Sequence, residues 1–250
     1  MEKIFVIKVT FILKKLFYFF FLSYLKFKFK FIKNKNIIIL GSAPHVNLNG
    51  LNLNEYLVVS CNGSAKNISN LKLKEPSLTV IDNELIDQDI AFYKKVRSNI
   101  LNNNLLKNLN LGHLISVQSN SSANSSPEIL NSNFNSFIKI NKNVRKIIIN
   151  DILNLDYFEI NDNSLISTGA FAILLCFYFG ASKVFFSGFS LIKRGKNHFY
   201  DDNEFNSDDL EIRNHSLADA TMIGLMKIQG YNLETFDKDF LFLMSNWNSG

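Results

Sequence analysis

Cysteine and histidine are scarce in this chain, which has two cysteines and four histidines among 250 residues. The sequence contains neither a CxxC pair nor a Cys/His cluster, so it indicates neither a zinc site nor a disulfide framework. Cys61 and Cys176 lie in apolar segments, where a small buried core residue is the usual interpretation. We therefore expect no metal site.

Several common nucleotide and hydrolase motifs are also missing. The chain has no P-loop, no Gly-x-Gly-x-x-Gly spacing and no Gly-x-Ser-x-Gly elbow. A P-loop hydrolase, a dinucleotide-binding fingerprint and an α/β-hydrolase are thus poorly supported. Apolar residues make up 47% of the chain, which argues against a disordered or fibrous protein. The length is sufficient for one sizeable α/β domain.

Positive charge is confined to one end of the chain. Residues 1–35 contain nine of the 27 basic residues and one of the 22 acidic residues, so this segment carries +8 and the remainder −3. A nucleic-acid-binding protein normally carries its basic charge on the folded body. We therefore exclude nucleic acid as a partner.

The N-terminal segment consists almost entirely of apolar residues and lysines. Its longest uncharged run, Leu16–Leu25, is short of the roughly 20 residues that a spanning helix needs, and Lys14-Lys15 precedes it. Lysines then alternate with phenylalanines from Lys26 to Lys33, a pattern that suits an anionic bilayer surface. An interfacial anchor, a short or tilted signal-anchor and a buried element of the fold all stay open. We expect membrane association, at a bacterial inner membrane facing the cytoplasm.

Short apolar runs that end in polar or glycine-containing turns predict the strands of the body. We expect strands at Asn36–Leu40, Tyr56–Cys61, Ser77–Ile81, His113–Val117, Lys146–Ile149, Val184–Ser187 and, at an edge, Asn232–Phe236. Helices are expected at Gly169–Gly180 and Ser216–Gly230, and loops at 118–136 and 191–213, the second being a C-terminal lid.

This alternation of strands and helices predicts a single doubly wound, mostly parallel sheet of Rossmann-like α/β type. Accordingly we divide the chain into a basic apolar membrane-associating segment (1–35), one catalytic domain (36–240) and a tail (241–250).

Polar residues follow the first three strands, where ligands of open α/β sheets bind. Gly41-Ser42 follows the first strand, Asn62 the second and Asn83 the third. An asparagine amide offers both donors and an acceptor, as pyrimidine or ribose recognition requires. At Gly41, however, a plain strand–helix turn explains the sequence equally well.

A second candidate element, Ser167-Thr168-Gly169, precedes the apolar helix. The N-terminus of a helix favours phosphate through its unpaired N–H groups and its dipole. Ordinary helix capping is an equal alternative.

His198 and His215 both lie in the polar C-terminal third. An imidazole there can act as acid or base near neutral pH, and a simple surface histidine is the alternative. The neighbouring aspartate pairs Asp201-Asp202 and Asp208-Asp209 are best interpreted as solvated.

Taken in order, these pieces resemble the motifs of sialyltransferases. Ile166–Gly169, the apolar stretch after it and Ala181–Phe189 resemble the small sialyl motif of the animal enzymes. His198–Asp201 is similar to their third motif, and His215 with the following helix to their very small motif. The front half, with its strand–glycine turn and Cys61-Asn62, resembles their large motif more loosely, and also the opening of the bacterial lipooligosaccharide sialyltransferase family. That bacterial family likewise has a His-Ser dipeptide before its last helix, here His215-Ser216.

The resemblance implies a metal-independent glycosyltransferase without a cofactor. It would move sialic acid or a related acidic sugar from a CMP-activated donor to a glycan or glycolipid acceptor, by an inverting direct displacement. His215 would be the general base, and His198 would assist the departing phosphate. The nucleotide would be held by Gly41, Ser42, Asn62 and Asn83, and its phosphate or the sugar carboxylate by Ser167, Thr168 and Gly169.

The donor sugar is less well specified than its nucleotide. The bacterial family has an arginine where Leu165 stands here, so CMP is better supported than sialic acid, and Kdo is compatible. Two other functions stay open: a different nucleotide-utilising enzyme, such as a pyrophosphokinase-like protein, and a non-catalytic membrane-associated protein with a degenerate pocket.

Overall fold

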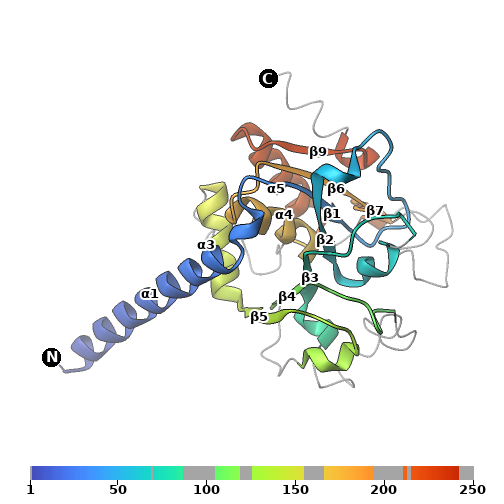
Figure 1. Cartoon of the computed structure of the whole chain (residues 1–250). Helices are drawn as coiled ribbons and strands as arrows, with labels where there is room; N and C mark the ends of the chain where they lie inside the picture. Colours follow the sequence, from blue (N-terminus) through green and yellow to red (C-terminus); the bar gives the residue numbers. More distant parts are fainter. Residues whose placement is uncertain are drawn as a thin grey trace.

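A computed structural model of the chain describes residues 2–68, 70–86, 105–118, 126–154, 166–193, 211–212 and 215–241. One seven-stranded sheet, ordered β5-β4-β3-β2-β1-β6-β9, forms the centre of the molecule (Figure 1). All of its strand pairings are parallel. The predicted single α/β sheet is therefore confirmed. Its strands are β1 (Asn36–Leu40), β2 (Tyr56–Cys61), β3 (Leu78–Asp82), β4 (His113–Val117), β5 (Ser136–Ile140), β6 (Lys183–Ser187) and β9 (Leu233–Thr235).

The strand order reverses beside β1. From β1 the chain adds β2 to β5 on one side, then returns to add β6 and β9 on the other. The loops that follow β1 and β6 therefore leave in opposite directions and open a crevice between them. In sheets of this kind, ligands bind in that crevice, beyond the carboxyl ends of the strands.

Both faces of the sheet are covered, which explains why the strands are apolar throughout rather than alternating. On one face lie α3 (Lys142–Leu153), α4 (Thr168–Tyr178) and α5 (Ser216–Ile228), and β1 contributes Ile37 and Ile39 to the core there. Ile38 and Leu40 point to the opposite core. The short elements of the described chain include the 3-10 helices η2 (Leu53–Glu55), η3 (Asn62–Asn67), η4 (Asn83–Ile86) and η6 (Pro127–Leu130).

One predicted strand, at Lys146–Ile149, is wrong, because this segment lies within helix α3. The helix starts at Asn141, whose side chain accepts a hydrogen bond from the N–H of Val144 at 3.0 Å. Val144, Ile148 and Ile152 recur every four residues and are buried, which is helical spacing. A run of three consecutive isoleucines hid this period in the sequence. Strand β5 was not predicted.

The other predicted strands and both predicted helices are present within a residue or two of their expected ends, and β9 is an edge strand as expected. Two short strands, β7 (Ile192–Lys193) and β8 (Glu211–Ile212), pair antiparallel inside the segment predicted to be a lid. Residues 194–210 of that segment lie outside the described residues.

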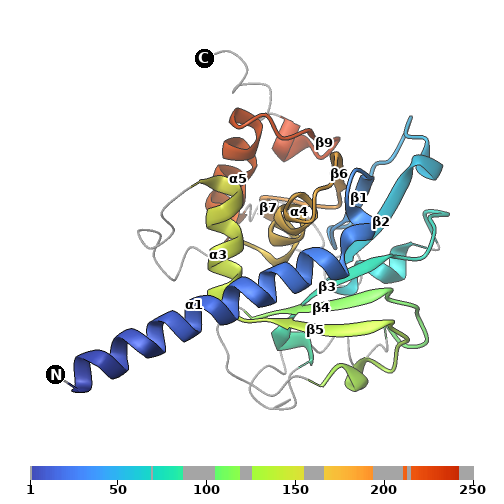
Figure 2. The same cartoon turned by 60° about the vertical axis from the view of Figure 1, so that its left-hand side comes forward.

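The N-terminal segment forms one long helix, α1 (Glu2–Lys28), followed by η1 (Lys30–Ile32). Helix α1 projects away from the body in both views (Figures 1 and 2). Its last turn and η1 join the core, where Leu25, Phe29 and Ile32 are buried and Phe29 stacks on Phe179 at 4.7 Å between ring centroids. Among the described residues, no helix has the length and apolarity needed to cross a bilayer.

Candidate active site

The loops after β1 and β6 touch at the carboxyl edge of the sheet. The N–H of Gly41 donates to the carbonyl of Ser187, and that of Ala43 to the carbonyl of Gly188, both at 2.8 Å. A Cβ atom on Gly41 would lie 2.2 Å from the Gly188 oxygen, and Gly188 has a φ of +81°. The close approach of the two loops is thus sufficient to require glycine at position 41. Whether this turn also holds a nucleotide stays a prediction.

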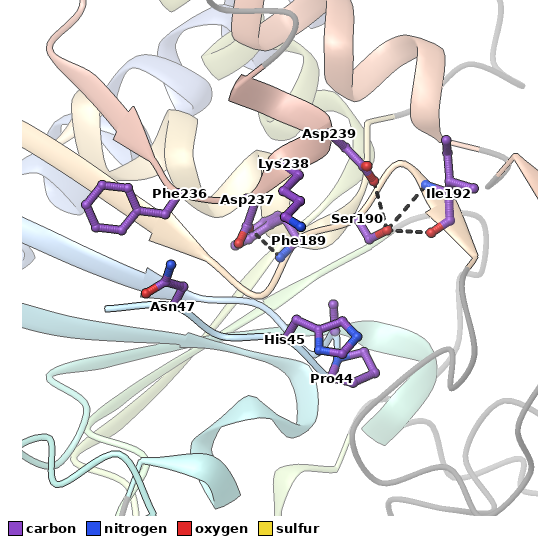
Figure 3. Close-up of a pocket in the computed structure, with 11 residues that line it drawn as sticks. Pro44, His45, Asn47, Phe189, Ser190, Ile192, Phe236, Asp237, Lys238 and Asp239 are labelled. Atoms are coloured by element: carbon purple, nitrogen blue, oxygen red, sulfur yellow. Dashed lines mark hydrogen bonds between the residues drawn. The ribbon is translucent and has the colours of Figure 1, made fainter. Parts of the chain in front are cut away.

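A cavity of about 440 Å³ lies where the loops after β1, β6 and β9 meet, at the reversal of strand order (Figure 3). Its volume is within the range of small-molecule sites, about 300–1,000 Å³. Among the residues that the structure describes, none that the sequence nominated lines it, although Gly41 and Ser42 immediately precede its first lining residues. The described residues that line it are Ala43, Pro44, His45, Asn47, Phe189, Ser190, Ile192, Phe236, Asp237, Lys238 and Asp239.

Two aspartates in the segment after β9 hold the β6 loop in place. The Asp237 carboxylate accepts from the Ser187 hydroxyl at 3.0 Å, the Gly188 N–H at 3.3 Å and the Phe189 N–H at 2.8 Å. Asp239 accepts from the Ser190 hydroxyl at 3.0 Å (Figure 3). It also accepts from the Leu191 N–H at 3.0 Å. The floor of the cavity is therefore shaped by hydrogen bonds between segments almost 50 residues apart.

Asp237 is buried, and burial raises the pKa of its carboxyl group from 3.8 to about 6. The three donors act in the opposite direction, because they stabilise the ionised form. Desolvation outweighs them, so this carboxylate titrates in the weakly acidic range.

The predicted Ser167-Thr168-Gly169 element begins helix α4. The Ser167 hydroxyl caps the helix by accepting from the N–H of Ala170 at 3.1 Å. A Cβ on Gly169 would lie 2.4 Å from the Phe189 ring, which fills the space over the start of the helix. Since Phe189 also lines the cavity, this element and the cavity are neighbours, separated by one aromatic ring.

Asp82, the last residue of β3, is hydrogen-bonded to the residue that follows β2 and to the first residue of α4. Asn62, in the left-handed region with a φ of +50°, accepts from the N–H of Asp82 at 2.8 Å through its side-chain oxygen. The Thr168 hydroxyl donates to the Asp82 carboxylate at 3.1 Å. Asn83 is buried, and its side-chain oxygen accepts from the Ser116 hydroxyl at 3.1 Å. The structure thus brings the predicted residues Asn62 and Thr168 together, with Asp82 between them.

Helix α5 presents His215 at its start and Asp219 one turn later. His215 is exposed, whereas Asp219 is buried and accepts from the N–H of Ser167 at 2.7 Å. Burial raises the pKa of Asp219, against the effects of Ser167, His215 and Arg145, which all favour its ionised form. One buried carboxylate therefore links the predicted base to the predicted phosphate element. His198, the other predicted catalytic residue, lies outside the described residues.

A buried arginine supports the same element from helix α3. The guanidinium of Arg145 donates to the carbonyl of Ile166 and lies 5.1 Å from the centre of the Phe171 ring. Arg145 therefore holds a positive charge against the backbone of Ile166, the residue before Ser167.

Asp82, Arg145, Asp219 and Asp237 are not among the site residues predicted from the sequence. Their partners lie 20 to 86 residues away along the chain, at separations that local patterns do not reveal. For Arg145 the sequence offered one sign, a basic residue among the buried apolar positions of α3.

The described part of the chain contains no group of three or more histidine, cysteine, aspartate or glutamate residues placed to hold a metal ion. Cys61 and Cys176 are free and buried, and burial raises the pKa of both thiols.

No protein-family model and no curated protein sequence matches this chain. Solved structures do match. The monofunctional alpha-2,3-sialyltransferase Cst-I from Campylobacter jejuni is 17% identical, with a TM-score of 0.51 over 82% of this chain and 77% of that one. CstII from the same organism, in complex with the substrate analogue cytidine-5'-monophosphate, is 14% identical, with a TM-score of 0.47 over 81% and 80%. The chain has the α/β fold of the sialyltransferase Cst-I.

Proposed function

We propose that the protein is a glycosyltransferase of sialyltransferase type that uses a CMP-activated acidic sugar. The observation that carries this proposal is the cluster at the carboxyl edge, where His215 and Asp219 adjoin the Ser167-Thr168-Gly169 element beside a sugar-sized cavity. The motif resemblance and the Cst-I fold support it.

The donor nucleotide would lie across the ends of β2 and β3 and the start of α4. The backbone N–H groups of Thr168 and Gly169, at the first turn of the helix, suit the phosphate. Carboxylates repel phosphate but accept hydroxyl protons, so Asp82 suits the ribose. Asn62 would offer its amide nitrogen to the base or ribose, because its oxygen already binds the N–H of Asp82. Ser42, in the loop after β1, and Asn83 would contact the nucleotide at this same site.

The sugar would occupy the adjoining cavity. Asn47 and Lys238 offer hydrogen-bond donors there, which suit the hydroxyl groups and the carboxylate of an acidic sugar. The two aspartates of the cavity, Asp237 and Asp239, already accept hydrogen bonds from the β6 loop.

In the transfer step, His215 would take the proton of the acceptor hydroxyl. The acceptor oxygen forms its bond to the anomeric carbon while the carbon–oxygen bond to CMP breaks, and CMP leaves with that electron pair. Attack from the face opposite CMP inverts the anomeric centre. The Asp219 carboxylate, one turn behind His215, attracts the imidazolium that forms. His198 would give a proton to the departing phosphate.

The test is release of CMP from CMP-sialic acid, with CMP-Kdo in parallel, on lactoside and lipooligosaccharide acceptors. His215→Ala should lower the transfer rate by about 10²–10⁴-fold, the usual contribution of a general base, and leave CMP binding unchanged. His113→Gln is the matched control, because His113 lies at the opposite edge of the sheet, at the start of β4. A full transfer rate in His215→Ala would show that His215 is not the general base. No transfer from either donor would contradict the proposal as a whole.

A further inference from the structure

The side of helix α1 that faces away from the body is apolar and aromatic. From Leu13 on, where the structure describes the side chains except that of residue 14, most large apolar residues of the helix are exposed, whereas Leu25 is fully buried. At 100° per residue, Leu16, Phe20 and Phe27 lie on the face opposite Leu25. The exposed set is Leu13 (60%), Leu16 (46%), Phe17 (61%), Phe19 (64%), Phe20 (66%), Tyr24 (48%) and Phe27 (69%).

Lysines lie on both flanks of this face. At the same angular spacing, Lys15 and Lys26 fall on one side of it and Lys28 on the other. The ammonium group of Lys26 lies 4.2 Å from the centre of the Tyr178 ring, on the body, and that of Lys30 lies 5.0 Å from the Phe27 ring. Cations thus line the boundary between the body and the apolar face.

We propose that this face of α1 binds the surface of an anionic lipid bilayer, with the helix axis in the membrane plane. A helix with an aromatic face and flanking lysines inserts that face at the boundary between headgroups and acyl chains, while the lysines meet anionic headgroups. This proposal is independent of the proposed function.

The charge distribution favours lipid over a second copy of the chain. Residues 1–35 contain nine lysines and one acidic residue, Glu2, so two such helices side by side would mainly oppose like charges. Anionic headgroups complement them, and each lysine near such a surface strengthens the attraction.

The position of Lys15 favours lying on the bilayer over crossing it. Lys15 is the midpoint of α1, whose 27 residues extend about 40 Å. In a spanning orientation it would be near the bilayer centre, where a charged lysine is unfavourable. In the membrane plane it reaches the headgroups.

The C-terminal end of α1 joins the body at the end of the sheet away from the candidate active site. Phe29 and Phe31 pack on His113, the first residue of β4, at 5.6 and 5.3 Å between ring centroids. Phe29 also stacks on Phe179, which follows the last residue of α4, whereas the site lies at the first residue. From there α1 runs toward the carboxyl end of the sheet, where the Asn143 amide at the start of α3 donates to the Tyr18 hydroxyl at 3.1 Å, and the rest of the helix extends beyond the body (Figure 2).

The experiment is sedimentation of the full chain with vesicles of phosphatidylcholine alone or with a third of phosphatidylglycerol. We expect binding to the anionic vesicles and at least a tenfold loss in Phe20→Gln/Phe27→Gln. The matched control is Ile228→Gln/Leu241→Gln, which replaces exposed apolar residues of the C-terminal part and should bind as wild type does. High salt should weaken binding, because it screens the lysines.

Depth and oligomeric state separate the other outcomes. Both native cysteines are buried, so a spin label can be directed to Phe20→Cys. A label at the headgroup boundary supports the proposal, and a label at the bilayer centre would overturn it in favour of a spanning helix. Absence of vesicle binding, with a dimer that Phe20→Gln/Phe27→Gln dissociates, would overturn it in favour of a second copy.

Discussion

Asp237 offers the sharpest test of how the cavity is built. In Asp237→Asn, the oxygen that accepts from the Phe189 N–H can be replaced by an amide nitrogen, which places two donors against each other. The alternative amide orientation would do the same to the Ser187 hydroxyl and the Gly188 N–H. A buried donor without its acceptor costs about 1–3 kcal/mol. We expect that loss in the free energy of unfolding at pH 4.

The pH dependence has a definite sign. The pKa of Asp237 is about 6 in the folded protein, against 3.8 for an ordinary aspartate. Between these values the folded state keeps a proton that the unfolded state has lost, so the free energy of unfolding falls as the pH rises through this window. A shift of about two units corresponds to roughly 3 kcal/mol. Asparagine does not titrate, so the deficit of Asp237→Asn should shrink or vanish by pH 7.

The assay is urea unfolding of both proteins at half-unit steps from pH 4 to pH 7.5, in which the titrations they share cancel in the difference. Glu234→Gln is the control, since it makes the same chemical change at an exposed carboxylate that pairs with Lys183 at 2.7 Å. That variant should lose at most about 1 kcal/mol. A difference between wild type and Asp237→Asn that stays constant from pH 4 to pH 7 would refute the reasoning.

Three further predictions concern the rest of the site and core. Gly41→Ala places a Cβ 2.2 Å from a backbone oxygen, so unfolding should become easier by about 1–3 kcal/mol in thermal or urea melts; unchanged stability would mean that the two loops separate easily. Asp219→Asn should lower kcat with little change in CMP affinity, and an equal loss in both would give Asp219 a merely structural role. Cys61 and Cys176 should react with a thiol reagent only after unfolding, since burial raises the pKa of both; rapid labelling of the native protein would contradict this.

The sheet could be predicted because its signals are local. Apolar runs such as Ile37–Leu40 end at glycine or asparagine, and a strand buried on both faces has that composition. Helix α3 was missed because three consecutive isoleucines imitate such a run and hide the four-residue spacing of Val144, Ile148 and Ile152.

The site was only partly predictable, for a different reason. Asn62 and Thr168 could be nominated from their places at a strand end and a helix start. Their common partner Asp82 contacts Thr168 across 86 residues. The cavity depends on the segment after β9 returning to the β6 loop, and no local pattern specifies that β9 lies beside β6.

The measurement that tests the central claim most directly is a thermal-shift comparison of CMP, UMP, AMP and ATP with magnesium. At 100 times its Kd, a ligand that binds only the folded state adds about 2.7 kcal/mol of stability. We predict a rise in Tm with CMP, retained in His215→Ala, and little effect of the other three. A rise with ATP and magnesium but not with CMP, or no rise with any nucleotide, would contradict the account.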